Sequence, residues 1–280
     1  MEIIPFQFDL VDPNNNYVWL APYVFAVVFI GIMFLVFKLF ERFYSIQYDK
    51  PLARHYFVYR RLKAEDKAFL RSNFSFYNRL KSKHKKQFEH FISSKNFMGR
   101  QDLQLENSHR LLIAAVGCML SFGRKNYNYK LIDTVLIYPN EFYSNSNEAY
   151  HQGEFNPQHR VIAFSWEDFE KGYEITNDNL NLGIHEFMHA MQIEAKVSRD
   201  ADSARFNKQF RNILRRLTNE DVKNKLEDTR FFRAYAFSNQ YEFMAVLSEY
   251  FFESPSEFRQ HFPEIYNYKK KMLNFNFIGY

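Results

Sequence analysis

His185, Glu186 and His189 form a short motif that could bind a metal ion and activate a water molecule. In a helix the two histidines, four residues apart, project from one face. Two imidazoles at that spacing can bind one Zn²⁺, and Glu186 then lies beside the open coordination position that a water would occupy. The pattern H-E-x-x-H is typical of zinc peptidases whose glutamate is the general base, but it requires a third ligand from elsewhere in the chain.

The third ligand is expected within residues 241–252, an almost wholly apolar helical segment that carries Glu242 and Glu249. A carboxylate on a buried helix is costly unless it is paired or bound to a metal. The two glutamates share a helix face but are separated by about 10.5 Å along the axis, so only one can bind the metal. The other is expected to orient a neighbour, such as a ligand histidine through its free ring nitrogen, or to pair with an arginine.

Composition narrows the class of protein. The chain has 280 residues and a formal net charge of +5. Its basic residues cluster between positions 54 and 100 without a recognisable nucleic-acid-binding module, so no direct nucleic-acid binding is expected. The single cysteine, Cys118, lies in an apolar run, which indicates a buried thiol and no adaptation to an oxidising compartment.

An N-terminal membrane helix is predicted at residues 17–38. No charged residue occurs from Tyr17 to Phe37, and about twenty apolar residues are enough to cross the ~30 Å hydrocarbon layer. A secretory signal peptide is the competing interpretation, but the positive n-region and small-residue cleavage site that it requires are missing. Lys38 and Arg42 follow the span, whereas no Lys or Arg precedes it. The positive-inside rule therefore predicts a single-pass protein of the cell (inner) membrane with its catalytic domain in the cytoplasm.

The remaining pattern predicts an α+β fold, helix-rich with a small sheet. Residues 107–122 read as an apolar helix, and residues 134–138 and 160–166 read as strands. The polar stretch 139–160 reads as a loop. Strand order suggests that residues 161–164 form the sheet edge that pairs with an extended peptide.

Four segments are predicted along the chain. They are an extracytoplasmic segment (1–16), the transmembrane helix (17–38), a basic helical region that packs on the peptidase domain (39–105) and the peptidase domain itself (106–280).

The motif helix and the helix at 241–252 together resemble the MtfA (Mlc titration factor A) family of zinc peptidases. Supporting similarities lie at residues 112–115, 136–139 and 164–168, and the resemblance covers roughly residues 60–265. The active-site layout is also similar, more distantly, to the protease domain of anthrax lethal factor. Two features depart from the family: the membrane span, and a shorter interval between His189 and Glu242.

The resemblance implies a zincin-like domain in which one Zn²⁺ is held by His185, His189 and Glu242. It also implies that Tyr235 assists the transition state, since a phenol near the metal can donate a hydrogen bond to an oxyanion.

The sequence therefore predicts a membrane-anchored zinc metallopeptidase that hydrolyses peptides or proteins through a zinc-bound water, with Glu186 as general base. Aminopeptidase and endopeptidase action both remain open. The alternative is a regulatory binding protein that sequesters a transcriptional repressor or another cytosolic partner, with peptidase activity secondary or latent. The intact motif favours catalysis, because a pure binder has no need of Glu186.

Overall fold

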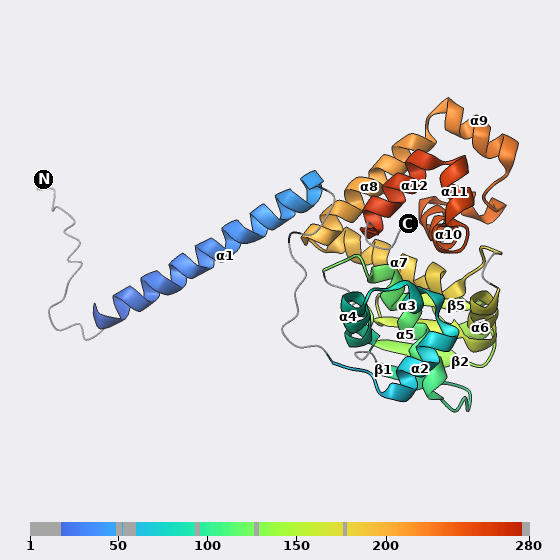
Figure 1. The fold of residues 1–280 in the computed structure, drawn as a ribbon, viewed down its shortest axis with the longest axis horizontal. Coiled ribbons are helices and arrows are strands. Elements are labelled where there is room, and N and C mark those ends of the chain that lie inside the picture. The colour runs from blue at the N-terminus through green and yellow to red at the C-terminus, as the bar shows by residue number, and fades with distance from the viewer. Residues whose placement is uncertain are drawn as a thin grey trace, which may run out of the picture.

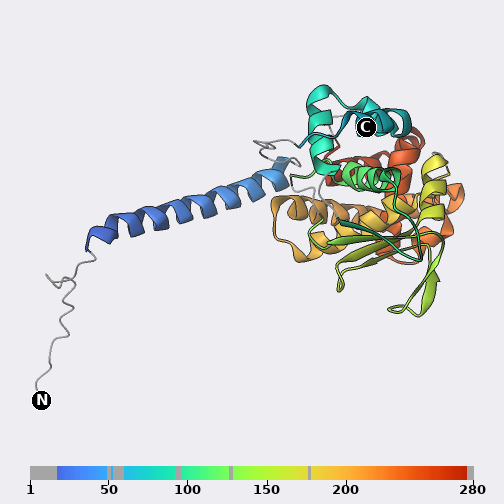
Figure 2. The ribbon, with the colours of Figure 1, turned by 90° about the horizontal axis from the view of Figure 1, so that it is seen from below.

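The protein is described by a computed structural model that covers residues 18–48, 52, 60–92, 96–125, 129–175 and 178–275. The predicted extracytoplasmic segment, residues 1–16, lies outside these residues. The described chain forms a helix-rich α+β domain from which one long helix projects (Figures 1 and 2). The predicted α+β class, helix-rich with a small sheet, is thereby confirmed.

A four-stranded sheet of order β1-β2-β6-β5 supports one side of the domain. Its strands are β1 (Asn96–Gly99), β2 (Thr134–Tyr138), β5 (Gly153–Asn156) and β6 (Val161–Ser165). The first three in spatial order run parallel, whereas β5 pairs with β6 antiparallel and forms one edge. Ile137 of β2 pairs with Phe164 of β6, and both are fully buried. Strand β6 is buried over most of its length, as in a sheet covered on both faces, whereas β2 alternates between buried and partly exposed side chains.

The two predicted strands correspond to β2 and β6, but two expectations for this region are wrong. The stretch 139–160 is not a plain loop: it holds the hairpin of β3 (Phe142–Ser144) and β4 (Ala149–His151), and then β5. These strands have three or four residues and partly exposed polar side chains, so they show no apolar alternation. The strand at 161–164 is not the edge, because β5 covers that side of β6.

Helices of the N-terminal half pack around this sheet. They are α2 (Ala64–Asn73), α3 (Ser75–Arg79), α4 (Ser82–Ile92), α5 (Asn107–Ser121) and α6 (Trp166–Glu174). The predicted apolar helix is α5, which is buried over most of its length because it packs against α2, α4 and α7.

Helices of the C-terminal half form a second layer, with α7 between the two layers (Figure 1). Helix α7 spans Leu182–Val197. The second layer consists of α8 (Ala201–Leu217), α9 (Glu220–Thr229), the 3-10 helix η2 (Ala234–Phe237), α10 (Gln240–Glu253), α11 (Pro255–His261) and α12 (Pro263–Leu273). Helix α7 contacts α5, α6, β5 and β6 on one side and α8 and α10 on the other. It is therefore the element that joins the sheet to the C-terminal helices.

One further helix, α1 (Ala21–Tyr48), follows the 3-10 turn η1 (Val18–Leu20) and projects from the domain (Figures 1 and 2). Among the described residues it is the one helix long and apolar enough to cross a membrane, and none of its most apolar 18-residue window is buried. Length and composition alone fit a membrane anchor or a signal sequence.

Lys269 of α12 is a fully buried cation beneath α7 and α10. Its Nζ lies 3.3 Å from the carbonyl oxygen of Met244, 3.9 Å from Sδ of Met188 and 4.0 Å from Sδ of Met272. Burial lowers the pKa of Lys269 to about 7 from its ordinary value of 10.5. The unfolded chain therefore binds the proton more tightly than the folded chain.

We predict that Lys269→Met stabilises the fold by about 2–4 kcal/mol near neutral pH, because the buried cation is removed without loss of volume. Between pH values of about 7 and 10 the wild type gains stability as pH rises, since the unfolded state binds more protons at this site. The variant should lose that slope. Denaturant unfolding at several pH values measures both effects, with Lys271→Met on the exposed face of α12 as control; equal slopes in wild type and Lys269→Met would contradict the prediction.

Candidate active site

The two motif histidines lie on one face of α7. The helix begins at Leu182 because Asn181 caps it: the side-chain oxygen of Asn181 accepts a hydrogen bond from the backbone N–H of Ile184 at 3.0 Å. The rings of His185 and His189 have centroids 4.7 Å apart. The spacing of four residues thus produces the expected pair of adjacent imidazoles.

Glu242 faces these histidines from the first turn of α10. Asn239 caps this helix by accepting hydrogen bonds from the backbone N–H groups of Tyr241 and Glu242 at 2.8 and 3.1 Å. The Glu242 carboxylate lies 2.9 Å from Nε2 of His185 and 3.4 Å from Nε2 of His189. One candidate ligand atom from each of the three residues lies within 4.8 Å of the others.

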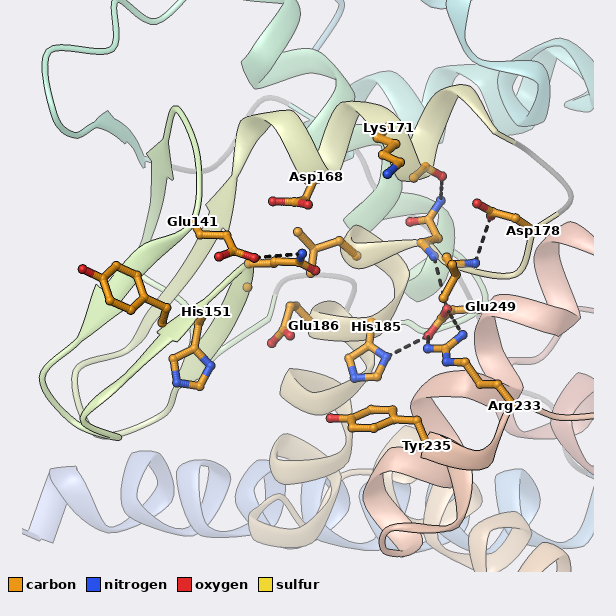
Figure 3. Close-up of a pocket in the computed structure, with 17 residues that line it drawn as sticks. Glu141, His151, Asp168, Lys171, Asp178, His185, Glu186, Arg233, Tyr235 and Glu249 are labelled. Carbon is orange, nitrogen blue, oxygen red and sulfur yellow. Dashed lines mark hydrogen bonds and ion pairs between the residues drawn. The ribbon is translucent and has the colours of Figure 1, made fainter.

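Glu249, two turns further along α10, is fully buried behind His185. Its carboxylate lies 2.7 Å from Nδ1 of His185. Arg233 donates to it through both terminal nitrogens, at 2.7 and 2.9 Å, and the backbone N–H of Asn181 donates at 3.1 Å. Figure 3 shows Glu249 with His185 and Arg233 around it. Both roles that the sequence left open for Glu249 are realised together, because it orients a histidine and pairs with an arginine.

The two carboxylates set the protonation of the histidine between them. Burial disfavours the charged form of His185, but the hydrogen bonds that its ring donates to Glu242 and Glu249 outweigh the burial and raise the pKa of His185 to about 9. Burial opposes ionisation of Glu242 as well, yet the two histidines hold its pKa well below the ordinary value. A metal cation at this position would take the place of that shared proton.

The donor set fits zinc. Two imidazole nitrogens and one carboxylate are a ligand set that catalytic zinc sites use, with further coordination left for water or substrate. Because Glu249 occupies Nδ1 of His185, the Nε2 atom of that ring is the one directed toward His189 and Glu242. His185, His189 and Glu242 could therefore hold one zinc ion.

Glu186 lies on the neighbouring face of α7 and is buried against the edge strand β5. Burial raises its pKa, although the charges of His189 and His185 and a hydrogen bond from the backbone of Phe155 act in the opposite direction. A Cβ atom at Gly153 would lie 2.7 Å from Cγ of Glu186. Only glycine lets the strand approach the carboxylate this closely.

Tyr235 belongs to η2 and lies beside the histidines, with its ring centroid 6.0 Å from that of His185. Its side chain is 52% exposed. Burial of the hydroxyl region and the charge of Glu242 raise the pKa of Tyr235 to about 12. The phenol therefore stays protonated and can donate a hydrogen bond at neutral pH.

These groups border a cleft of about 530 Å³ (Figure 3). His185, Glu186, Tyr235, Arg233 and Glu249 form one wall, and the opposite wall comes from the β3–β4 hairpin, β5 and α6. The cleft also carries acidic side chains, namely Glu141, Asp168 and Asp178. An extended chain could therefore lie between β5 and the histidines.

Sequence reasoning missed three participants of this cleft. A buried glutamate calls for a neutralising cation, and Arg233 was one candidate. Nothing in the residues around Arg233, including the nearby Tyr235, indicates that it pairs with Glu249. The backbone N–H of Phe155 leaves no trace in side-chain pattern. His151 lines the cleft and its buried Nε2 has no hydrogen-bond partner among the described residues; one histidine in a polar stretch does not stand out.

Comparison with known families now identifies the class. Residues 51–273 match the family described as glucose-regulated metallo-peptidase M90, and the chain belongs to this family. It is therefore a metallopeptidase by family, and such a family implies a metal ion, usually zinc. The predicted likeness to the MtfA family is confirmed, whereas the distant likeness to anthrax lethal factor stays a prediction.

The chain is also similar to a particular protein, the uncharacterized protein slr2042 of Synechocystis sp. (strain ATCC 27184 / PCC 6803 / Kazusa). The two are 25% identical over 246 residues, which cover 80% of this chain and 85% of that protein.

We predict that Glu249→Gln weakens zinc binding about 10- to 100-fold, because His185 loses the charged group that fixes its tautomer and ring orientation. Chelator competition on the purified chain measures the affinity. Glu253→Gln, one turn further along the same helix, is the matched control, since Glu253 accepts a hydrogen bond from Asn181 and belongs to no described contact with His185. Equal affinities for the two variants would remove Glu249 from the site.

Proposed function

We propose that this protein is a zinc-dependent peptidase, anchored in the cell membrane with its catalytic domain in the cytoplasm. The observation that carries the proposal is the convergence of His185, His189 and Glu242 beside the buried Glu186. A metal site next to a buried carboxylate, in a cleft bordered by the edge strand β5, is suited to peptide hydrolysis.

His185, His189 and Glu242 would hold the metal. When bound, a zinc ion supplies Lewis-acid activation of water and polarisation of the scissile carbonyl. The contribution of the protein is to fix the ligands: Glu249 and Arg233 hold His185 in place, so that little reorganisation is needed during the reaction.

Glu186 would act as the general base and then as the general acid. Its raised pKa moves the carboxylate toward neutral pH, where a group can both accept and return a proton. The carboxylate would take a proton from the attacking water and deliver it to the nitrogen of the leaving amine.

Tyr235 would donate a hydrogen bond from its hydroxyl to the oxyanion that develops on the scissile carbonyl. Its position beside His185 and its raised pKa support this role. Tyr235 is half exposed and lines the cleft.

The substrate would bind as an extended peptide along β5. One edge of β5 pairs with β6, and the other faces the cleft beside Glu186. Backbone pairing with a free strand edge gives affinity with little dependence on sequence. This strand takes over the role that sequence reasoning assigned to residues 161–164.

We predict that Glu186→Gln keeps zinc binding but lowers peptidase activity by about 10²–10⁴-fold, since proton transfer is lost. Tyr235→Phe should lower kcat by about 10²-fold with little change in KM, because one oxyanion donor is removed. Digestion of a peptide library followed by product sequencing measures both and separates aminopeptidase from endopeptidase action. Unchanged hydrolysis by Glu186→Gln would remove Glu186 from the mechanism.

The same Glu186→Gln variant tests the regulatory alternative. Capture of one cytosolic partner, such as a transcriptional repressor, by wild type and variant alike, together with weak hydrolysis, would favour a binding protein. The buried base beside the histidines supports the peptidase instead.

The membrane proposal rests on α1. Trp19 and Tyr23 are exposed near its N-terminal end, and Lys38 and Arg42 follow its apolar run. The last turns of α1 pack on α8 of the domain, and this packing supports a permanent anchor.

We predict that the chain stays with membranes after alkaline extraction, and that its domain is protected from protease added outside intact cells. The charge asymmetry across α1 gives the physical reason. Immunoblotting of fractions follows both results; a soluble, shortened chain would indicate a cleaved signal sequence.

A further inference from the structure

The last turns of α1 are joined to the catalytic domain by buried polar contacts. Glu41 is buried and lies 3.3 Å from Nζ of Lys38, and Lys125 contacts its other oxygen. The pair with Lys125 joins α1 to the domain, because separating the two elements would break it and leave Glu41 with Lys38 of its own helix.

Ser45, one turn further along, is fully buried against α8. Its hydroxyl donates to the carbonyl oxygen of Ala201 at 3.3 Å and accepts from Arg205 at 3.0 Å. Nζ of Lys208 donates to the carbonyl oxygen of Ile46 at 2.6 Å. The helix therefore does not tether the domain through a free linker, because its own last turns are part of the packed structure.

The length of α1 places this junction close to the lipid. The helix has 28 residues and is thus about 42 Å long, close to the ~40–45 Å of a bilayer with its headgroups. The apolar run ends at Phe37. Glu41 follows Lys38 by only about 4.5 Å along the axis, whereas each headgroup layer is about 5–7 Å thick. The domain consequently begins within the headgroup layer.

The exposed residues at this junction have the composition of a lipid-contacting surface. On α1, Phe40 and Phe43 are exposed on the side away from α8, and Phe43 is 64% exposed. On the domain, the connection between α7 and α8 lies on the side from which α1 extends (Figures 1 and 2). Val197, the last residue of α7, is also 64% exposed, and the exposed Arg199 follows it in this connection. Aromatic and basic side chains are favoured at membrane interfaces.

We propose that Phe40, Arg42, Phe43, Val197 and Arg199 form a headgroup surface, which rests on the phosphates of the cytoplasmic leaflet and holds the domain at one orientation. This inference rests on the proposed anchor. Lipid is the occupant because the exposed apolar face of α1 continues from the membrane-spanning run into these turns without a break in the helix.

The orientation bears on the substrate. His185 of the site and Val197 of the headgroup surface both lie on α7, about 18 Å apart along the helix axis. The site therefore lies no more than about 18 Å from the headgroup surface. Polypeptide segments exposed close to the cytoplasmic face of the membrane are therefore the substrates that this arrangement favours.

The test uses the full chain in nanodiscs of phosphatidylcholine and phosphatidylglycerol that contain a nitroxide-headgroup lipid. Single cysteines replace Phe43, Val197 or Asp228 in a Cys118→Ala background and carry a fluorescent label. Asp228 is exposed on α9, at the far side of the domain (Figure 1). Quenching at positions 43 and 197 should be at least about threefold stronger than at 228, because the headgroup layer is thin.

A second set of variants tests the rigid junction. Glu41→Ala with Ser45→Ala should reduce quenching at position 197 to the level of 228 and leave position 43 quenched. Gln47→Ala, on the exposed side of the same helix, should change neither position. Quenching at 197 that survives the double substitution would overturn the role of the junction.

The remaining outcomes are also decisive. Quenching at 43 without quenching at 197 overturns the headgroup surface while the anchor stands. Loss of quenching at 43 in nanodiscs that hold two chains assigns this face to a second copy and overturns the lipid contact. A chain that does not enter nanodiscs contradicts the proposed anchor itself, and peptidase activity is judged separately by Glu186→Gln.

Discussion

Neutralising the carboxylate of Glu249 is the constraint on which the site depends. The side chain is fully buried, and an unpaired charge there would cost several kcal/mol. Its partners come from three segments: His185 of α7, Arg233 before η2 and the backbone N–H that precedes α7. Satisfying one charge therefore joins α7, α10 and η2, and the same contact turns Nε2 of His185 toward His189 and Glu242.

The same few ångströms contain carboxylates in opposite environments. Glu242 lies between two imidazoles, which lower its pKa, whereas burial raises the pKa of Glu186. Pairs of acids whose surroundings separate their pKa values commonly divide roles between charge stabilisation and proton transfer. Gly153 makes this division possible, because a larger residue there would displace Glu186 from the strand.

The position of α7 connects catalysis to the rest of the fold. Its first half carries the histidines, its middle packs between the sheet layer and the C-terminal helices, and its last residues lead into α8, on which α1 is seated. The cleft is thus connected to the long apolar helix through α7, α8 and the buried polar contacts between α8 and α1.

The features that could be predicted from the sequence alone are those that depend on the spacing of nearby residues. Four-residue spacing predicted the histidine pair of α7, an uncharged run predicted the apolar part of α1 but not its last turns to Tyr48, and apolar runs predicted α5, β2 and β6. Helix and strand periodicity place these side chains before any long-range contact forms. The cost of burying charge also marked Glu242 and Glu249 as the glutamates that need partners.

The contacts of Glu242 and Glu249 became known from the tertiary structure. Glu242 and Glu249 meet His185 from 57 and 64 residues away, and no local pattern encodes which turn of α10 faces which ring. The edge position of β5 could not be predicted, because the strands of this region are short and polar and show no alternation. The packing of α1 on α8 could not be predicted either, since it joins residues 156 apart in the chain. Such contacts are set by packing between distant segments, which spacing along the sequence does not specify.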